Sequence, residues 1–239
     1  YHTDGYRLDR GFQVLFTAYA AAARHLDYTA LKAREFDPGA TLVKKGKRYE
    51  IADPLRRPAD LLPSMLNPLV SPLDKLRVLK LQAEVRKASN AEIFEGRLQP
   101  AGYDDETTEE YLNRLGFSEK FFINNFIRPF YGGIFLDRSL QTSARMFQFT
   151  FKMLANGEII LPAEGIQRIP EQLAATLPKG SVRCNARVAE LLIEDGRVQG
   201  VRLVTGERIE AEQVVVATSS PVAERFVHKT LPDTPMSTV

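Results

Sequence analysis

The segment DGYRLDRGFQV, Asp4–Val14, holds the first residues whose types suggest chemistry. From Tyr6 to Val14 it is typical of a strand that ends in a tight loop around Gly11. A glycine there has no Cβ to obstruct a bulky ligand, so the backbone can come close to one. The residues after it can then offer main-chain donors to a ring system. The alternative is a glycine that only serves a turn, and the segment alone leaves both open.

A second candidate lies at the end of the apolar run QVVVAT, residues 213–218. A run without alternation indicates a strand covered on both faces. Ligands of open α/β sheets bind beyond the carboxyl ends of strands, where the small residues Ala217 and Thr218 leave room. The alternative is a packed strand followed by an ordinary Ser-Pro turn.

The remaining titratable residues predict no site. Cys184 is the only cysteine, and His2, His25 and His228 lack the spacing of metal ligands, so we expect neither an internal disulfide nor a zinc site. The acidic run at 104–110 stands at a predicted helix start, where the helix dipole accounts for it. No residue is therefore assigned as a catalytic acid or base.

Composition excludes several classes of protein. The chain has 239 residues, of which 44% are hydrophobic and 26% charged, so a disordered or collagen-like chain is excluded. The formal net charge is +2, and we expect no nucleic-acid partner. No apolar run approaches the roughly 18 to 20 residues of a membrane span, and the start of the chain lacks a signal-peptide pattern. We therefore expect a cytoplasmic location.

The elements that must position these residues are β-rich at both ends of the chain and helical in the middle. Predicted strands cover 6–14, 159–161, 187–195, 198–204 and 213–218, with a hairpin at 41–51. Predicted helices cover 18–26, 73–88, 107–115, 143–155 and 166–177. The fold class is therefore mixed α/β. We expect residues 1–35 and 157–239 to fold together as one domain, with residues 36–156 inserted as a second.

Aromatic residues crowd the middle of the chain, in 118–135 and 143–155, and we expect these two segments to pack together. The residues concerned are Phe126, Tyr131, Phe135, Phe147 and Phe151. Such side chains line tunnels for hydrophobic substrates. Aromatic residues at helical spacing also form ordinary cores, and the pattern leaves both interpretations open.

Three segments in order resemble the flavin-containing amine oxidase superfamily, which includes phytoene desaturases and protoporphyrinogen oxidases. They are DGYRLDRGFQVL, then FIRPFYGGIFLDRSLQTSARMFQF with LPAEGIQRIPEQLAATL, then RVAELLIEDGRVQGVRLVTGERIEAEQVVVAT. The resemblance implies an FAD-dependent oxidoreductase that takes a hydride from a small or hydrophobic organic substrate. It also implies a partial Rossmann-like FAD-binding domain, with the helical insertion supplying the substrate pocket.

The resemblance further implies which residues contact FAD. They are Gly11, Phe12, Gln13, Val14, Val188, Ala217 and Thr218. The loop made by the first four lies against the flavin, and the backbone of Val188 meets the adenine. The strand end at Ala217 and Thr218 passes close to the dinucleotide.

The chain also departs from the pattern of this superfamily. The GxGxxG turn that places a pyrophosphate on a helix N-terminus is absent, and so is the C-terminal segment that covers the flavin. A loop often written Gly-Gly reads Glu164-Gly165. We therefore expect an internal fragment of a longer flavoprotein, inactive and holding little or no FAD by itself. The sequence predicts no oligomeric state.

Two alternatives concern other partners. Apolar residues from Leu61 to Leu81 alternate with Lys75, Arg77 and Lys80, which is typical of a helix at a membrane surface and equally of an amphipathic helix covering a core. The competing function for the whole chain is a non-catalytic module that binds a lipid or a partner protein.

Overall fold

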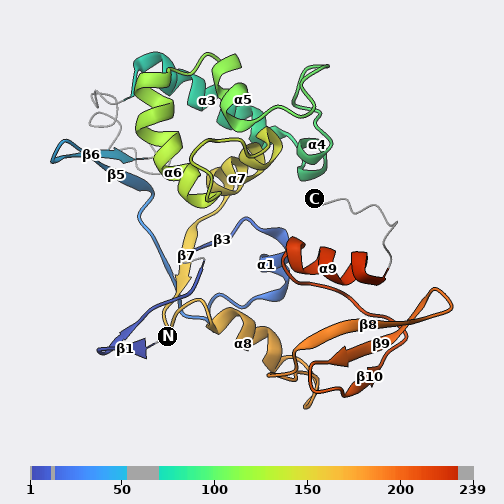
Figure 1. Cartoon of the computed structure of the whole chain (residues 1–239). Helices are drawn as coiled ribbons and strands as arrows, with labels where there is room; N and C mark the ends of the chain where they lie inside the picture. The colour runs from blue at the N-terminus through green and yellow to red at the C-terminus, as the bar shows by residue number, and fades with distance from the viewer. Residues whose placement is uncertain (1, 12–13, 53–69, 231–239) are drawn as a thin grey trace. The chain divides into compact units, whose positions relative to one another are not determined.

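The computed structural model describes residues 2–11, 14–52 and 70–230 as helices and small antiparallel sheets (Figure 1). It contains two compact units, residues 1–176 and 177–239, which are described separately below. The mixed α/β fold class is confirmed. The predicted domain division, 1–35 with 157–239 against 36–156, has different boundaries from these units and stays a prediction.

The first unit begins with short strands, which belong to a two-stranded and a three-stranded antiparallel sheet. Its first elements are β1 (His2–Thr3), β2 (Tyr6–Arg7), β3 (Leu15–Phe16), α1 (Ala20–His25) and β4 (Ala33–Glu35). The central strand of the sheet is β7 (Ile159–Pro162), which pairs with β3 on one side and β4 on the other. The ladder therefore joins the start of the chain to the segment that follows the helical region.

The predicted strand over 6–14 is wrong in length. Asp4 and Gly5 both have positive φ, 49° and 79°, which turns the chain so that β1 pairs with β2 as a two-residue hairpin. After β2, the side chain of Asp9 accepts a hydrogen bond from the backbone of a distant segment. Residues 8–11 are not in a strand.

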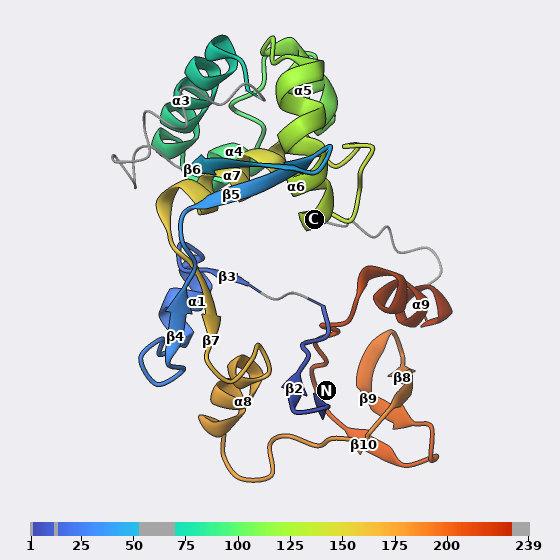
Figure 2. The same ribbon diagram turned by 90° about the vertical axis from the view of Figure 1, so that its left-hand side faces the viewer.

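The predicted hairpin at 41–51 is confirmed by β5 (Gly39–Lys44) and β6 (Lys47–Ala52), joined by a turn at Lys45 and Gly46. Both turn residues have positive φ, as a two-residue hairpin turn requires. Lys44, at the tip, donates from Nζ to Oδ1 of Asn125 at 2.6 Å. Figure 2 shows this hairpin lying along the helical region.

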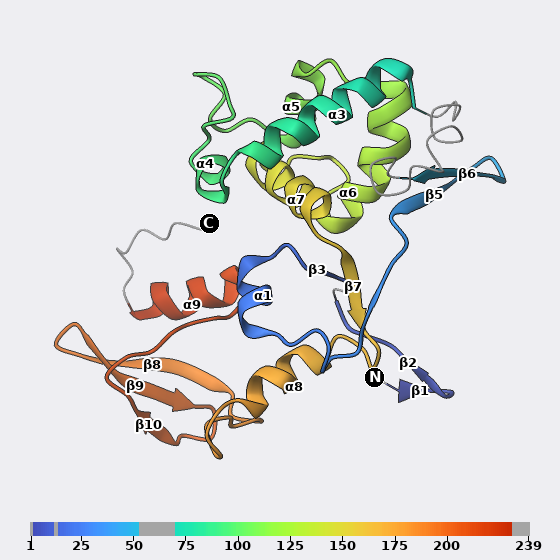
Figure 3. The same ribbon diagram turned by 180° about the vertical axis from the view of Figure 1, so that it is seen from behind.

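Six helical elements follow within residues 70–156, and four of them begin after a Ser or Thr whose side chain caps the helix. They are α3 (Pro72–Lys87), α4 (Asn90–Phe94), α5 (Thr108–Arg114), the π-helix η2 (Glu119–Ile127), α6 (Arg128–Ile134) and α7 (Ala144–Asn156). The capping box of Thr107 and Glu110 is present at α5. Figure 3 shows α3 lying over α7, against which it packs.

The core of the first unit is aromatic, as the two crowded segments predicted. The ring of Tyr131 lies 4.8 Å from that of Phe147 and 6.5 Å from that of Phe151, centroid to centroid. Tyr131 and Phe147 are completely buried, while Phe126 and Phe135 pack at the edge of the cluster and are only partly buried. For Tyr131 and Phe147 the core interpretation holds, because each fills the space beside the other.

A buried carboxylate fastens α3 to the start of η2. Asp74 accepts hydrogen bonds from the hydroxyls of Ser71 and Ser118, from the amide of Ser118 at 2.9 Å and from Arg77 at 3.2 Å. Burial alone raises the pKa of Asp74, but these hydrogen bonds outweigh it and hold the pKa below its ordinary value. The ionised carboxylate is therefore part of the fold.

The first unit ends with α8 (Arg168–Ala175), a shorter form of the helix predicted at 166–177. The second unit contains β8 (Val188–Glu194), β9 (Arg197–Leu203), β10 (Arg208–Glu210) and α9 (Ser220–Thr230), with α9 packed against β8. Its three strands form a sheet of their own, in the order β10-β9-β8. The described strands thus do not unite both β-rich ends of the chain in one sheet.

The predicted strand at 213–218 is wrong. The third strand is β10, which pairs with β9, and residues 211–219 have no ladder partner in the described part of the chain. Val215 is 89% exposed. An apolar run becomes a buried strand only where neighbouring strands accept its backbone bonds and layers cover it, and hydrophobicity alone does not supply those neighbours.

Candidate functional site

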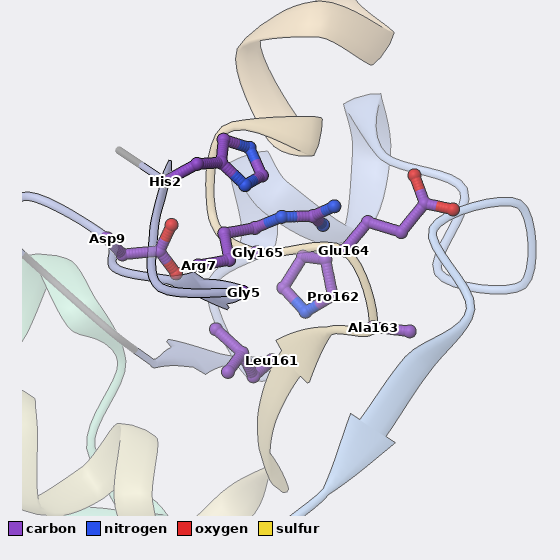
Figure 4. A pocket seen from close by; sticks show the side chains of 9 residues that line it. All are labelled: His2, Gly5, Arg7, Asp9, Leu161, Pro162, Ala163, Glu164 and Gly165. Atoms are coloured by element: carbon purple, nitrogen blue, oxygen red, sulfur yellow. The ribbon is translucent and has the colours of Figure 1, made fainter.

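A pocket of about 340 Å³ lies where the start of the chain meets the turn between β7 and α8 (Figure 4). It is lined by His2, Gly5, Arg7, Asp9 and the run Leu161–Gly165. Two of the three segments that carry the family resemblance, DGYRLDRG and LPAEG, therefore form one site within the first unit.

Short elements position the lining. The β1–β2 hairpin supplies His2, Gly5 and Arg7, while β7 and the turn after it supply the opposite side. Asp9 joins the two sides, because its Oδ2 accepts a hydrogen bond from the backbone N–H of Ile166 at 3.0 Å. This bond spans sequence positions that only the fold brings together.

Gly165 is the residue of the turn that favours the absence of a side chain. Its φ of +89° belongs to the left-handed region that favours glycine. A Cβ at this position would also lie 2.9 Å from Oδ1 of Asp9 and 3.0 Å from Cδ of Arg7. The backbone conformation thus favours glycine here, and a Cβ would also force the side chains of Asp9 and Arg7 to shift.

Glu164, the first residue of the Glu164-Gly165 pair, lines the pocket and also pairs with the next helix. Its carboxylate lies 3.4 Å from Nε of Arg168, the first residue of α8. In Figure 4 Asp9 and Glu164 lie on opposite sides of the pocket, with Arg7 between them. The chain therefore departs from a Gly-Gly pair only at Glu164. The second position, Gly165, where φ is positive, is still a glycine.

The lining can recognise a polar ligand of either sign. His2 and Arg7 offer nitrogen donors, and Asp9 and Glu164 offer carboxylate acceptors. No group of three or more His, Cys, Asp or Glu side chains suited to a metal ion occurs in residues 2–11, 14–52 and 70–230. The polar side chains of the lining offer hydrogen bonding and charge pairing.

The loop predicted to contact the flavin begins two residues after Asp9. Gly11 has φ of +88°, and a Cβ built on it would meet no atom within 4 Å. Phe12 and Gln13 lie outside the described residues, and Val14, which is half-buried, leads directly into β3.

The other predicted FAD contacts lie in the second unit. Val188 begins β8, opposite Leu203 of β9, and is half-buried. Ala217 and Thr218 are exposed in the segment between β10 and α9. They remain predictions, as do the contacts of the loop in the first unit.

The acidic run at 104–110 has structural partners. Glu106 is buried and forms two hydrogen bonds with Arg114, at 2.7 and 2.8 Å. Glu109 pairs with Arg128, and Glu110 closes the capping box of α5. Of these, the Glu109–Arg128 pair joins α5 to α6, while the Glu106 and Glu110 contacts stabilise α5 and the residues just before it.

Comparison with known families identifies the chain. The model of the flavin-containing amine oxidoreductase family matches residues 1–238. The chain belongs to this family. A search of curated proteins finds no match. As a flavin-containing amine oxidoreductase the protein is a flavin-dependent oxidoreductase, and the predicted cofactor, FAD, agrees with the family.

Sequence reasoning missed Asp9 as a residue of the site. Its only trace in the sequence is its place in Asp9-Arg10-Gly11, two residues before the glycine that was singled out. Its partner Ile166 has no recognisable feature, because the bond uses the backbone N–H.

No helix of the described residues is long and apolar enough to cross a membrane.

Proposed function

We propose that the protein containing this chain oxidises a small or hydrophobic organic substrate by hydride transfer to FAD. The observation that carries the proposal is the meeting of the DGYRLDRG and LPAEG segments in one pocket of a flavin-containing amine oxidoreductase. Asp9, which lines this pocket, precedes Gly11 by two positions in the chain. FAD supplies the hydride acceptor, and the protein orients the substrate and tunes the ring.

The residues proposed to hold FAD are those that the resemblance implied. The backbone from Gly11 to Val14 would lie against the ring, where no Cβ of Gly11 intervenes. The backbone of Val188 would meet the adenine, and Ala217 and Thr218, exposed and small, would leave the dinucleotide room. The protein's part in this proposal is binding and orientation, and no side chain is assigned as an acid or base.

A hydrophobic substrate is favoured by the helical region. Phe126 and Phe135 lie at the edge of the aromatic cluster and keep part of their rings unburied, so they are the candidates for substrate contact. Tyr131 and Phe147 act as the support behind them, since they are completely buried.

The test is the flavin content of the purified full-length protein. We expect it to carry the visible absorption of bound flavin, or to gain it on incubation with FAD, and to lose it when the substrate reduces the flavin without oxygen. Amines, isoprenoids and porphyrinogens are the substrate panel. Protein that is colourless and stays so with FAD would overturn the proposal.

A non-catalytic binding module is the alternative. It predicts that an isoprenoid or porphyrin raises the melting temperature while FAD does not. Differential scanning fluorimetry with each compound alone separates the two functions.

A contact with a lipid surface is a second proposal, favoured by the outer face of α3. Leu73 and Leu76 are 63% and 64% exposed there, and Lys80 and Lys87 are exposed on the same helix. Apolar side chains beside cations suit the interface of an anionic bilayer. The part of this predicted segment before residue 70 lies outside the described residues.

Vesicle co-sedimentation tests this second proposal. Leu76→Asn should reduce binding to vesicles with anionic lipid, whereas Leu136→Asn, which changes an exposed leucine away from α3, should not. Equal binding of the two variants, or no binding of the wild type, would remove it.

A further inference from the structure

A larger pocket, of about 840 Å³, lies within the helical region. One wall is α3, which contributes Arg77, Lys80, Leu81 and Glu84. Their spacing places these four residues on one face of the helix. The rest of the lining comes from α4 and the residues after it, and from the residues that follow α5. Pockets for small organic ligands measure roughly 300 to 1,000 Å³, so this one has room for such a ligand.

The apolar part of the lining belongs to the core. Leu81 and Phe117 are buried, while Leu98 and Leu115 are partly buried against the same cluster. The ring of Phe117 stacks on that of Phe122, with 4.6 Å between the centroids. Because close packing fixes these side chains, the apolar lining has its shape before any ligand binds.

Cations outnumber carboxylates in the lining. The cations are Arg77, Lys80, Lys87 and Arg97, and the carboxylates are Glu84 and Glu92. Arg97 pairs with Glu95, outside the lining, at 2.7 Å. Lys80 and Lys87 have no ion-pair or hydrogen-bond partner in the described part of the chain. Glu84 lies about one turn from each lysine, and a single carboxylate balances only one of them. The lining therefore has positive charge left for an anion.

Arg77 is held in place beside Lys80. Its Nη1 lies 3.2 Å from Oδ1 of the buried Asp74, and a Cβ built on Gly116 would lie 3.1 Å from its Nη2. The Arg77 side chain is still 35% exposed, so a ligand can reach it. The contact with Asp74 uses one of the five N–H donors of a guanidinium. The remaining donors suit the two oxygens of a carboxylate, and Lys80 adds a second charge about one turn along α3.

We propose that this pocket binds an anionic amphiphile, which has one carboxylate on an apolar chain. Arg77 and Lys80 bind the carboxylate, and the chain lies against Leu81, Leu115 and Phe117. The proposal does not rest on the function proposed above, because none of these residues is a predicted FAD contact. The pocket also shares no lining residue with the pocket at the start of the chain.

The first test compares three ligands with the same chain and different head groups. The purified protein is titrated by calorimetry with decanoate, decanol and decylammonium, each in monomeric form and without vesicles. We expect decanoate to bind about tenfold more tightly than the other two, the effect of one charge-assisted hydrogen bond. Leaving out vesicles separates binding in the pocket from binding of α3 to a lipid surface.

The second test uses variants at exposed positions, where substitution is compatible with folding. Lys80→Glu reverses one charge of the lining and should weaken decanoate binding about tenfold. Lys179→Glu is the matched control, since it reverses an exposed charge outside the helical region and should leave the affinity unchanged. Ala83→Trp places a large ring at the pocket without altering its charge and should also weaken decanoate binding. Denaturant unfolding of each variant checks that it is folded.

Each outcome bears on the pocket separately from the flavin. No binding of free decanoate, or equal affinity for the three ligands, overturns the proposal. Equal decanoate affinity in Lys80→Glu and Lys179→Glu, or unchanged affinity in folded Ala83→Trp, would mean that the ligand binds elsewhere, which also overturns it. Protein that binds decanoate selectively but no FAD would contradict only the function proposed above.

Discussion

The helical region, residues 70–156, and the second unit, residues 177–239, differ in how many of their apolar side chains are buried. The helical region buries a continuous aromatic and aliphatic cluster that includes Tyr131 and Phe147. Among the described residues of the second unit, only Leu192 and Leu203 are buried hydrophobic side chains, and Val215 is exposed. The described part of the second unit therefore buries far fewer apolar side chains than the helical region does.

This difference matches the roles proposed for the two regions. A densely packed cluster can hold the side chains that contact a substrate in place without a bound ligand. A sheet followed by an exposed apolar segment has surface left for a cofactor, and binding to the folded state would then stabilise it. The predictions below test this contrast, from the largest expected effect to the smallest.

Tyr131→Ala should be the most damaging change. The ring is completely buried against Phe130, Phe135, Phe147 and Phe151, so its removal should cost about 3 to 5 kcal/mol in the free energy of unfolding. Tyr131→Phe is the control. In the described structure the buried hydroxyl has no hydrogen-bond partner, so this variant should be as stable as the wild type or more so. Denaturant unfolding measures both. A strongly destabilised Tyr131→Phe would show that the hydroxyl has a partner.

Asp74→Ala should cost about 2 to 3 kcal/mol near neutral pH, because Ser118 and Arg77 lose a buried ionised acceptor. The effect should depend on pH. Since folding lowers the pKa of Asp74, its contribution is complete above the unfolded pKa of about 4 and is lost as pH falls through the lower folded value.

Unfolding of the wild type and Asp74→Ala at a series of pH values measures this contribution. The difference in the free energy of unfolding between the wild type and Asp74→Ala should narrow below about pH 4. A difference that is constant with pH would show that the carboxylate contributes through packing instead of charge.

Thr107→Ala should have an intermediate effect. It removes the hydroxyl that accepts from the N–H of Glu110 at 3.2 Å and should destabilise α5 by about 1 kcal/mol. Thr107→Ser, which keeps the hydroxyl, should restore the denaturant midpoint. Equal midpoints for the Ala and Ser variants would contradict the capping role.

Val215→Ala should have the smallest effect, within about 0.5 kcal/mol, because the side chain is already in solvent. Val85→Ala makes the same change at a completely buried position of α3 and should cost about 2 kcal/mol. The pair compares the two regions directly. Comparable losses would mean that Val215 is buried in the protein in solution.

Local patterns predicted the local elements well. The capping box of Thr107 and Glu110, the Lys45–Gly46 hairpin and the helix ending near Asn156 each depend on residues a few positions apart. Such contacts do not depend on the tertiary structure, so spacing in the sequence is enough to find them.

The strand errors have a different origin. Residues 213–218 are apolar enough for a buried strand, yet they pair with no described strand, and β10 lies beside β9 in their place. A strand exists only with a partner, and partners are distant in the sequence. The same reason shortens the strand predicted at 6–14, where the Asp4–Gly5 turn returns the chain on itself.

The sequence by itself determined the mixed α/β class and the helices predicted at 73–88, 107–115 and 143–155, because these depend on residue types at short, regular spacing. The order of three longer segments gave the resemblance that implied the family and its flavin cofactor. Only the tertiary structure decided that Asp9 meets the backbone of Ile166, that a Cβ at Gly165 would displace Asp9, and that Tyr131 supports a core. Each of these depends on the distance between segments far apart in the chain, and that distance arises from packing.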